Sequence, residues 1–207
     1  MDQLGNPEYG YIVPAVAKDR IRIVFDNSGS MSGQKLQDAQ IGCEEFLRAC
    51  TLNHTAVGVH PMTGTGLELT ADLPSLAAAV HGIKIAGNTP MFRTLTQAQH
   101  AEPKATRIIV FSDGAPTDSG KEESINTAIQ AKTPIDTVLI WEGGAGVESS
   151  SEYALLKEIA DRTGGIFLVF DRTKVNFQDA FKYFSPNLRL ALSDGNFRAD
   201  LQNGKIR

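Results

Sequence analysis

Residues 21–30 read Ile-Arg-Ile-Val-Phe-Asp-Asn-Ser-Gly-Ser, and this stretch decides how the chain is expected to fold. The first five residues form a mostly apolar run, rich in β-branched residues, of the kind found in buried strands. The next five place one carboxylate and two hydroxyls, those of Asp26, Ser28 and Ser30, in a tight loop before a helical pattern that begins near Gly33. All three side chains are hard oxygen donors, which suit a divalent cation such as Mg²⁺.

The composition indicates a soluble globular chain. Its 207 residues are 42% hydrophobic, which is enough for a substantial core in a single domain. The formal net charge of -4 and the lack of a long basic run argue against nucleic acid as the main partner. The chain does not open with a secretory signal pattern, and no apolar run reaches the roughly 18 residues that span a bilayer. We therefore expect a cytoplasmic protein with no membrane partner.

Apolar runs alternate with helical patterns along the chain, which predicts an α/β fold with a doubly wound, mostly parallel sheet flanked by helices. Strands are expected at 21–25, 55–60, 66–70, 107–111, 135–141 and 166–170. Helices are expected at 33–50, 73–81, 89–98, 119–131, 149–163 and 177–184. These elements place one domain at residues 20–185, between an N-terminal segment, 1–19, and a C-terminal tail, 186–207. The sequence of the tail does not decide between an ordered and a disordered structure.

Several helix starts carry side chains suited to capping. Thr89 stands before Pro90, and these two residues suit the cap and the first helical position. Ser119–Glu122 and Ser149–Glu152 both have the spacing of a capping box. Asp118 is expected to cap or solvate the helix that follows it.

The sulfur-containing residues are expected to pack in the core. Cys43 and Cys50 lie seven residues apart on one predicted helix. Two helical turns separate them by roughly 10 Å, which is too far for a disulfide, so buried reduced thiols are expected. Met31 and Met91 follow two of the polar loops and are expected to pack beneath them. The four histidines show no zinc-ligand spacing.

Two of the predicted central strands, 21–25 and 107–111, end in loops that begin with an acidic residue near a glycine. If the strands are parallel, Asp26 and Asp113 emerge at the carboxyl edge of the sheet, where open α/β sheets hold their ligands. Each loop taken alone is more often an ordinary turn, because Asp, Asn, Ser and Gly are common turn residues. The combination of loops favours a shared site.

Three separated motifs carry a more specific signal. They are Asp26-x-Ser28-x-Ser30, Gly87-Asn88-Thr89-Pro90 and Ser112-Asp113-Gly114. In order and spacing they resemble the metal-ion-dependent adhesion site of von Willebrand factor A domains, and the likeness extends over roughly residues 20–185. The resemblance implies a Rossmann-like fold in which Ser28, Ser30 and Thr89 ligate the metal directly, while Asp26 and Asp113 hold it mostly through waters. Asn88 departs from the common Gly-Gly before the threonine, which leaves the loop shape open.

The same resemblance implies a binding module that is not an enzyme. Neutral hydroxyl ligands leave Mg²⁺ with much of its positive field, so an open coordination position can accept an Asp or Glu side chain of a partner protein. Mn²⁺ and Ca²⁺ are alternative metals. Stand-alone bacterial and phage-type domains of this size, including those that accompany AAA+ ATPase or tellurite-resistance systems, are similar to this chain. A partner from such a system is therefore an expectation by analogy.

Two other functions are alternatives to metal-dependent binding of an acidic side chain of a partner protein. A metal-dependent phosphohydrolase of the haloacid-dehalogenase type also places an Asp after its first strand, but it requires a second acidic residue where this chain has Ser28. In a purely structural assembly subunit, the metal would only pin loops. Some members of the resembled family also move their last helix, here residues 177–184, when the metal site is engaged.

Overall fold

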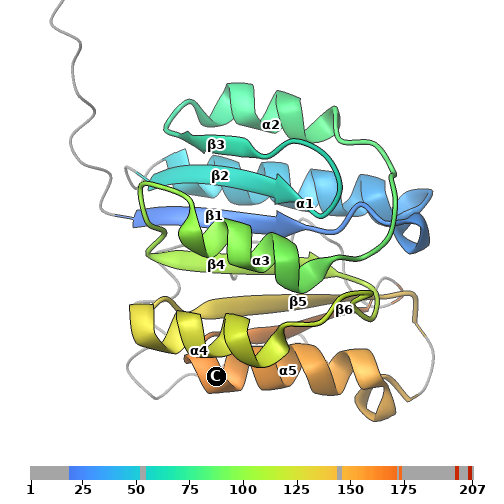
Figure 1. Cartoon of the computed structure of the whole chain (residues 1–207). Coiled ribbons are helices and arrows are strands. Elements are labelled where there is room, and N and C mark those ends of the chain that lie inside the picture. Colours follow the sequence, from blue (N-terminus) through green and yellow to red (C-terminus); the bar gives the residue numbers. More distant parts are fainter. Residues whose placement is uncertain are drawn as a thin grey trace, which may run out of the picture.

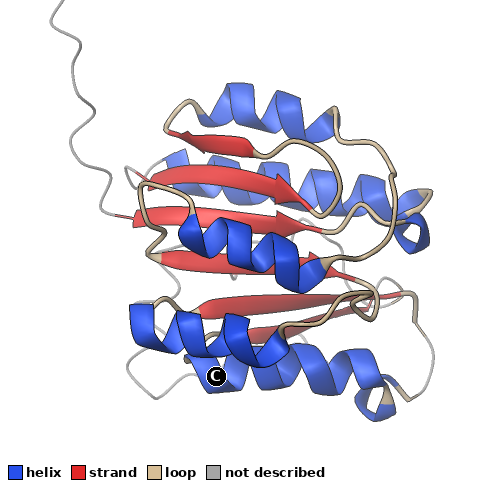
Figure 2. Cartoon of the chain, viewed as in Figure 1, coloured by secondary structure: helices blue, strands red, loops and turns tan. Residues whose placement is uncertain are grey.

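The computed structural model describes residues 19–51, 55–143, 146–171, 173, 199–200 and 205–206. Its centre is a six-stranded sheet with helices on both faces (Figures 1 and 2). The strands are β1 (Asp19–Phe25), β2 (Thr55–Pro61), β3 (Leu67–Thr70), β4 (Arg107–Ser112), β5 (Ile135–Trp141) and β6 (Phe167–Asp171). The helices are α1 (Gln34–Thr51), α2 (Leu73–His81), α3 (Met91–His100), α4 (Lys121–Ala131) and α5 (Ser151–Thr163). Short 3₁₀ turns, η1 (Gly29–Met31) and η2 (Val147–Ser149), and a two-residue strand pair, β7 (Ala199–Asp200) and β8 (Lys205–Ile206), complete the described elements.

The strand order across the sheet is β3-β2-β1-β4-β5-β6. All neighbouring strands are parallel except the antiparallel β2–β3 pair at one edge. The chain therefore winds outward from β1 in both directions, and β1 and β4 lie side by side where the winding reverses. The predicted α/β fold with a mostly parallel, doubly wound sheet is confirmed, and each described strand and helix of the six-stranded unit begins and ends within two residues of its predicted bounds.

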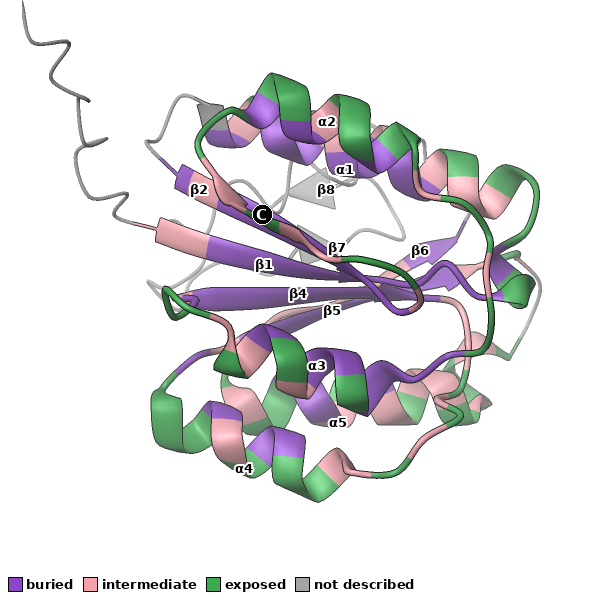
Figure 3. Cartoon of the chain, turned by 45° about the horizontal axis from the view of Figure 1, so that its top comes forward, coloured by how far each residue is buried: buried purple, intermediate pink, exposed green. Residues whose placement is uncertain are grey.

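The central strands of the sheet are buried on both faces (Figure 3), and most of their residues are apolar, although Arg22, Arg107 and Asp136 are buried there too. Alternate residues of β1 point to opposite faces, so Ile21, Ile23 and Phe25 pack under α1 and α2, while Val24 packs under α3, α4 and α5. The continuous apolar run at residues 108–111 of β4 is typical of a strand buried on both faces.

The sulfur-containing side chains lie in this core. Cys43 and Cys50 are free and fully buried on the sheet-facing side of α1, which confirms the predicted reduced, buried thiols. Burial raises the pKa of both thiols, so neither is disposed to act as a thiolate nucleophile. Met31 and Met91 are also fully buried, on opposite faces of the sheet, as expected.

The predicted helix caps are largely wrong in detail. Helix α3 begins at Met91, and Pro90 rather than Thr89 occupies the cap position without a side-chain bond. Helix α4 is preceded by Gly120 with a φ of 120°, so Ser119 does not form the predicted capping box. Ser150, one residue later than expected, caps α5 by accepting a hydrogen bond from Tyr153 N at 3.1 Å.

The predicted helix 177–184 lies outside the described residues, as do nearly all of the N-terminal segment 1–19 and most of the tail 186–207. Within the described part of the chain, no helix has the length and apolar character needed to cross a membrane.

Candidate metal site

The loops that follow β1 and β4 meet at the carboxyl edge of the sheet because these two strands are parallel and in register. Phe25 lies opposite Phe111, so the residues that follow these strands emerge at the same level. The backbone N–H of Asp26 donates to the carbonyl oxygen of Phe111 at 3.0 Å, which ties the first loop to the end of β4. The predicted convergence of Asp26 and Asp113 at this edge is therefore seen in the fold.

The Asp26 carboxylate lies beneath the loop and is fully buried. Its Oδ1 accepts a hydrogen bond from the backbone N–H of Ser28 at 2.9 Å, and its Oδ2 accepts one from Ser112 Oγ at 2.5 Å. Burial raises the pKa of Asp26, although the hydrogen bonds from Ser112 and Ser28 oppose that effect. Asp26 thus holds the loop in shape, and its two oxygens face protein donors.

The two serine hydroxyls lie above Asp26 in a chain of hydrogen bonds. Ser28 Oγ and Ser30 Oγ are 3.0 Å apart, and Ser30 Oγ donates to Asp113 Oδ1 at 2.8 Å. Ser28 is buried, whereas Ser30 is exposed. A Cβ placed on Gly114 would lie 3.6 Å from Ser30 Oγ, so the glycine keeps this side of the hydroxyl cluster open.

Thr89 belongs to a loop that is bonded to both of the others. Its carbonyl oxygen accepts a hydrogen bond from Thr117 N at 2.9 Å, which joins it to the loop after β4. On the other side, Asn27 donates through Nδ2 to the carbonyl oxygen of Lys84 at 2.9 Å, and its own backbone carbonyl oxygen accepts a hydrogen bond from Ala86 N at 2.8 Å. Thr89 itself is only 6% exposed. The predicted hydroxyl residue is therefore held in the same cluster of loops by backbone contacts.

Asp118 has a role that differs from the prediction. Its carboxylate accepts hydrogen bonds from the backbone N–H groups of Phe92 at 3.2 Å and Arg93 at 2.7 Å, so it caps the start of α3 and not the helix that follows it. A carboxylate suits this position because the first N–H groups of a helix lack partners within the helix. Asp118 thereby helps to hold the end of the loop that carries Thr89.

Lys35, in the first turn of α1, was not among the predicted site residues. Its Nζ lies 2.5 Å from Asp113 Oδ2 and 3.4 Å from Glu142 Oε1, just after β5. Burial alone would lower the pKa of Lys35, but the hydrogen bond to Asp113 and the charges of Asp113 and Glu142 outweigh it and raise the pKa. Lys35 and Asp113 lie 78 positions apart in the sequence, so no local sequence pattern predicts that they pair.

The side chains at this edge suit a hard divalent cation. Ser28 and Ser30 present neutral oxygens beside the carboxylate of Asp113, with the second carboxylate, Asp26, behind them. Mg²⁺ is held in proteins by oxygen ligands of this kind, usually with several waters. Among the described residues no group of three or more His, Cys, Asp or Glu side chains is placed to hold a metal.

Comparison with known proteins bears on the fold. Residues 21–115 match the von Willebrand factor type A domain family, a range that includes all three loops. This chain has a von Willebrand factor A (vWA) fold. BatB from Bacteroides thetaiotaomicron is similar in structure, with a TM-score of 0.66 and 20% identity over 84% of this chain and 99% of that one.

Two further solved structures share the vWA fold. An aerotolerance-related membrane protein from Bacteroides fragilis has a TM-score of 0.64 and 18% identity, over 83% of this chain and 99% of that one. The SpRpn10 VWA domain has a TM-score of 0.63 and 17% identity, over 81% of this chain and 95% of that one. No curated protein sequence matches the chain. At these identities the structural likeness establishes the fold alone.

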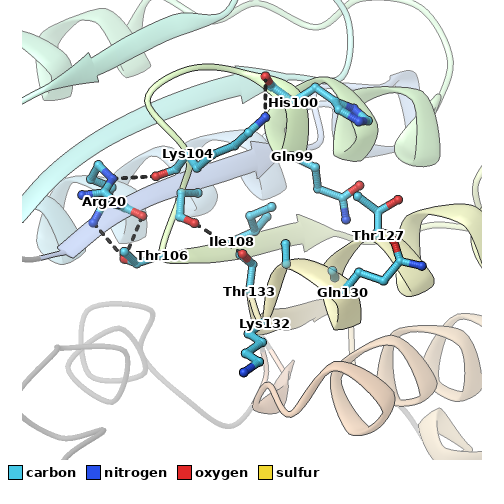
Figure 4. Close-up of a pocket in the computed structure, with 13 residues that line it drawn as sticks. Arg20, Gln99, His100, Lys104, Thr106, Ile108, Thr127, Gln130, Lys132 and Thr133 are labelled. Carbon is cyan, nitrogen blue, oxygen red and sulfur yellow. Dashed lines mark hydrogen bonds between the residues drawn. The ribbon is translucent and has the colours of Figure 1, made fainter.

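A pocket of about 720 Å³ lies at the opposite, amino edge of the vWA sheet (Figure 4). Its lining includes Arg20, Lys104 and Lys132, but the charged ends of these side chains point apart in Figure 4. Lys104 Nζ donates to the carbonyl oxygen of His100 at 3.1 Å, at the end of α3, and Lys132 follows the end of α4. Cations at helix C-termini complement the exposed carbonyl groups there, so the basic character of the pocket has a structural cause.

Proposed function

We propose that this vWA domain is a protein-interaction module that binds an acidic side chain of a partner protein through a divalent cation, with Mg²⁺ as the expected metal. Ser28, Ser30 and Thr89 would be the direct ligands, and Asp26 and Asp113 would act mostly through waters. The observation that carries the proposal is the hydroxyl pair of Ser28 and Ser30, hydrogen-bonded to Asp113 at the carboxyl edge of the sheet.

The donor chemistry explains why such a site would bind a carboxylate. A cation held by neutral hydroxyls keeps most of its charge and supplies a strong attraction for one more anionic oxygen. The chain supplies position and rigidity: Asp26 is fixed by two hydrogen bonds, and backbone bonds join the three loops. The partner would complete the coordination, and the surrounding loops would select it.

The enzymatic alternative gains no support from the geometry. A phosphohydrolase of the haloacid-dehalogenase type needs the first Asp as an accessible nucleophile. Asp26 is fully buried, and both of its oxygens accept hydrogen bonds from the protein. The residue two positions later, Ser28, cannot act as the second carboxylate.

Metal titration tests the proposal directly. Isothermal titration calorimetry with Mg²⁺ and with Mn²⁺ should show one site in the wild type. A Ser28→Ala, Ser30→Ala double variant should weaken binding by at least the roughly 10- to 100-fold that loss of an outer-shell group causes. Ser75→Ala is the matched control, because Ser75 is an exposed serine on α2 and distant in sequence from the three loops.

Affinity capture then tests docking. Partner proteins should be retained with Mg²⁺, released by chelator, and lost in the double variant, while the oligomeric state stays the same. Equal metal affinity in the wild type and the double variant would refute the ligand assignment. Partner retention that survives both chelation and the double variant would show that the loops bind without a metal.

A further inference from the structure

Both oxygens of Asp113 are used by the chain itself. Oδ1 accepts a hydrogen bond from Ser30 Oγ at 2.8 Å, and Oδ2 accepts one from Lys35 Nζ at 2.5 Å. The Asp113 side chain is 2% exposed, so Lys35 and Ser30 replace the water that would otherwise solvate it. The carboxylate expected to serve the metal is thus already paired with a cation of the protein.

Lys35 is in an unusual place for a lysine. It is the second residue of α1, and a cation in the first turn of a helix is disfavoured by the helix dipole. Its side chain is nevertheless only 13% exposed and reaches toward the loop after β4. The carboxylates of Asp113 and Glu142 provide the attraction that offsets this cost, and Glu142 Oε1 lies 3.4 Å from Nζ on the more exposed side.

We propose that Lys35 is a tethered competitor of the metal: its ammonium group neutralises Asp113 in the metal-free domain and must move toward Glu142 before a divalent cation can use Asp113. The inference rests on the proposed function, since it concerns the same site. Lys35 would act as a regulatory residue that sets the metal concentration at which docking begins.

Electrostatics sets the direction and size of the effect. The Lys35 ammonium group contacts Asp113 Oδ2 at 2.5 Å, and the attraction between two opposite charges at contact is worth more than the roughly 1.4 kcal/mol that changes an equilibrium constant tenfold. A divalent cation that uses Asp113 must displace that interaction or tolerate a positive charge beside it. Removal of Lys35 should therefore strengthen metal binding. An ordinary outer-shell residue has the opposite effect, because its loss weakens metal binding by about 10- to 100-fold.

The test compares Lys35→Met with the wild type by calorimetric titration of the metal alone, with Mg²⁺ and with Mn²⁺, after circular dichroism has verified folding. Lys35→Met should bind the metal about tenfold more tightly or better, because the competing positive charge beside Asp113 is gone. Lys35→Arg, which keeps the charge, should not gain affinity. Lys157→Met is the matched control: it removes one positive charge from an exposed pair with Asp161 on α5 and should leave the affinity unchanged.

Thermal stability gives a second readout. Without metal, Lys35→Met should melt at a lower temperature than the wild type, because Asp113 loses its partner while buried. Saturating Mn²⁺ should raise the melting temperature of Lys35→Met by more than it raises that of the wild type, because tighter binding to the folded state gives greater stabilisation.

Glu142→Gln probes the movement of the ammonium group. It should weaken metal binding in the wild-type background, because Lys35 loses the group that would receive it, and the loss should be smaller in the Lys35→Met background. A double-mutant cycle isolates this coupling from the general effect of one negative charge. Equal losses in the two backgrounds would overturn the proposed movement.

The outcomes separate this inference from the proposed function. If the wild type binds the metal and Lys35→Met binds it equally well or more weakly, the competition is overturned and the proposed metal site stands. Binding that appears only in Lys35→Met supports the competition. Absence of metal binding in both proteins overturns the inference and the proposed function together.

Discussion

Replacing Asp118 with alanine removes the two hydrogen bonds that cap α3 from the loop after β4. The Asp118 carboxylate accepts from Phe92 N at 3.2 Å and from Arg93 N at 2.7 Å. Its loss leaves two N–H groups at the helix start without side-chain acceptors, and Phe92 N is part of a residue that is only 4% exposed. The same change loosens the segment that begins with Thr89, only two residues before α3.

The size of the loss follows from cap energetics. Loss of a capping side chain costs about 0.5–2 kcal/mol, and a charged acceptor with two bonds belongs in the upper half of that range. We therefore expect Asp118→Ala to lower the free energy of unfolding by about 1–2 kcal/mol. Asp118→Asn keeps one acceptor oxygen and loses the charge, so about 0.3–1 kcal/mol is expected.

Urea unfolding followed by circular dichroism measures these values in the metal-free protein. Asp161→Ala is the control, because Asp161 forms an exposed pair with Lys157 one helical turn away, and such pairs contribute about 0.5 kcal/mol or less. Mn²⁺ titration of the same variants should show weaker binding in Asp118→Ala, since Thr89 would be less well held. An unfolding free energy for Asp118→Ala no lower than that of Asp161→Ala would refute the capping role.

Two further predictions concern stability. Burial, and then the charge of Arg22, lower the pKa of His60 in the folded protein. The folded state therefore binds a proton less readily than the unfolded state, so the contribution of His60 is complete above its ordinary pKa of 6.5 and is lost as the pH falls through the lower folded value. His60→Gln should lose less stability on acidification in urea unfolding series, and identical pH dependence in the two proteins would contradict this. Gly165→Ala should destabilise by about 3 kcal/mol, because its Cβ would lie 1.9 Å from the carbonyl oxygen at the start of β5. Gly164→Ala is the comparison: at a φ of +72°, with no atom within 4 Å of the added Cβ, it should cost only about 1 kcal/mol. Equal losses of stability in the two variants would show that the contact between the Cβ at position 165 and the β5 carbonyl is relieved at little cost.

Much of the fold was predictable because its signals are local. A strand buried on both faces is apolar over most of its length, and residues 108–111 and 138–140 show this directly in the sequence. The helix α1 buries Cys43 and Cys50 on one face, and their seven-residue spacing already placed them together. The two motifs that follow β1 and β4 were recognisable for the same reason: each joins a strand to a short polar loop.

The exact helix starts were less predictable because capping depends on competition between neighbours. Ser150 caps α5 although Ser149 has the better capping-box spacing, and Ser119 does not cap α4 at all. A shift of the helix start by one residue changes which serine hydroxyl can reach a free N–H group of the first turn. These choices depend on how each loop crosses the edge of the sheet, which local residue preferences do not encode.

The sequence by itself determined the α/β fold, the buried thiols, and the set of oxygen donors that includes Asp26, Ser28 and Asp113. These features depend on short-range patterns and on the order of motifs along the chain. Only the tertiary structure decided that Lys35 pairs with Asp113 and that Asp118 caps α3. Each contact joins a carboxylate of the loop after β4 to a donor on a helix, Lys35 Nζ in one case and backbone N–H groups of α3 in the other. These groups meet only after the sheet has formed, and their spacing in the sequence gives no measure of their distance in space.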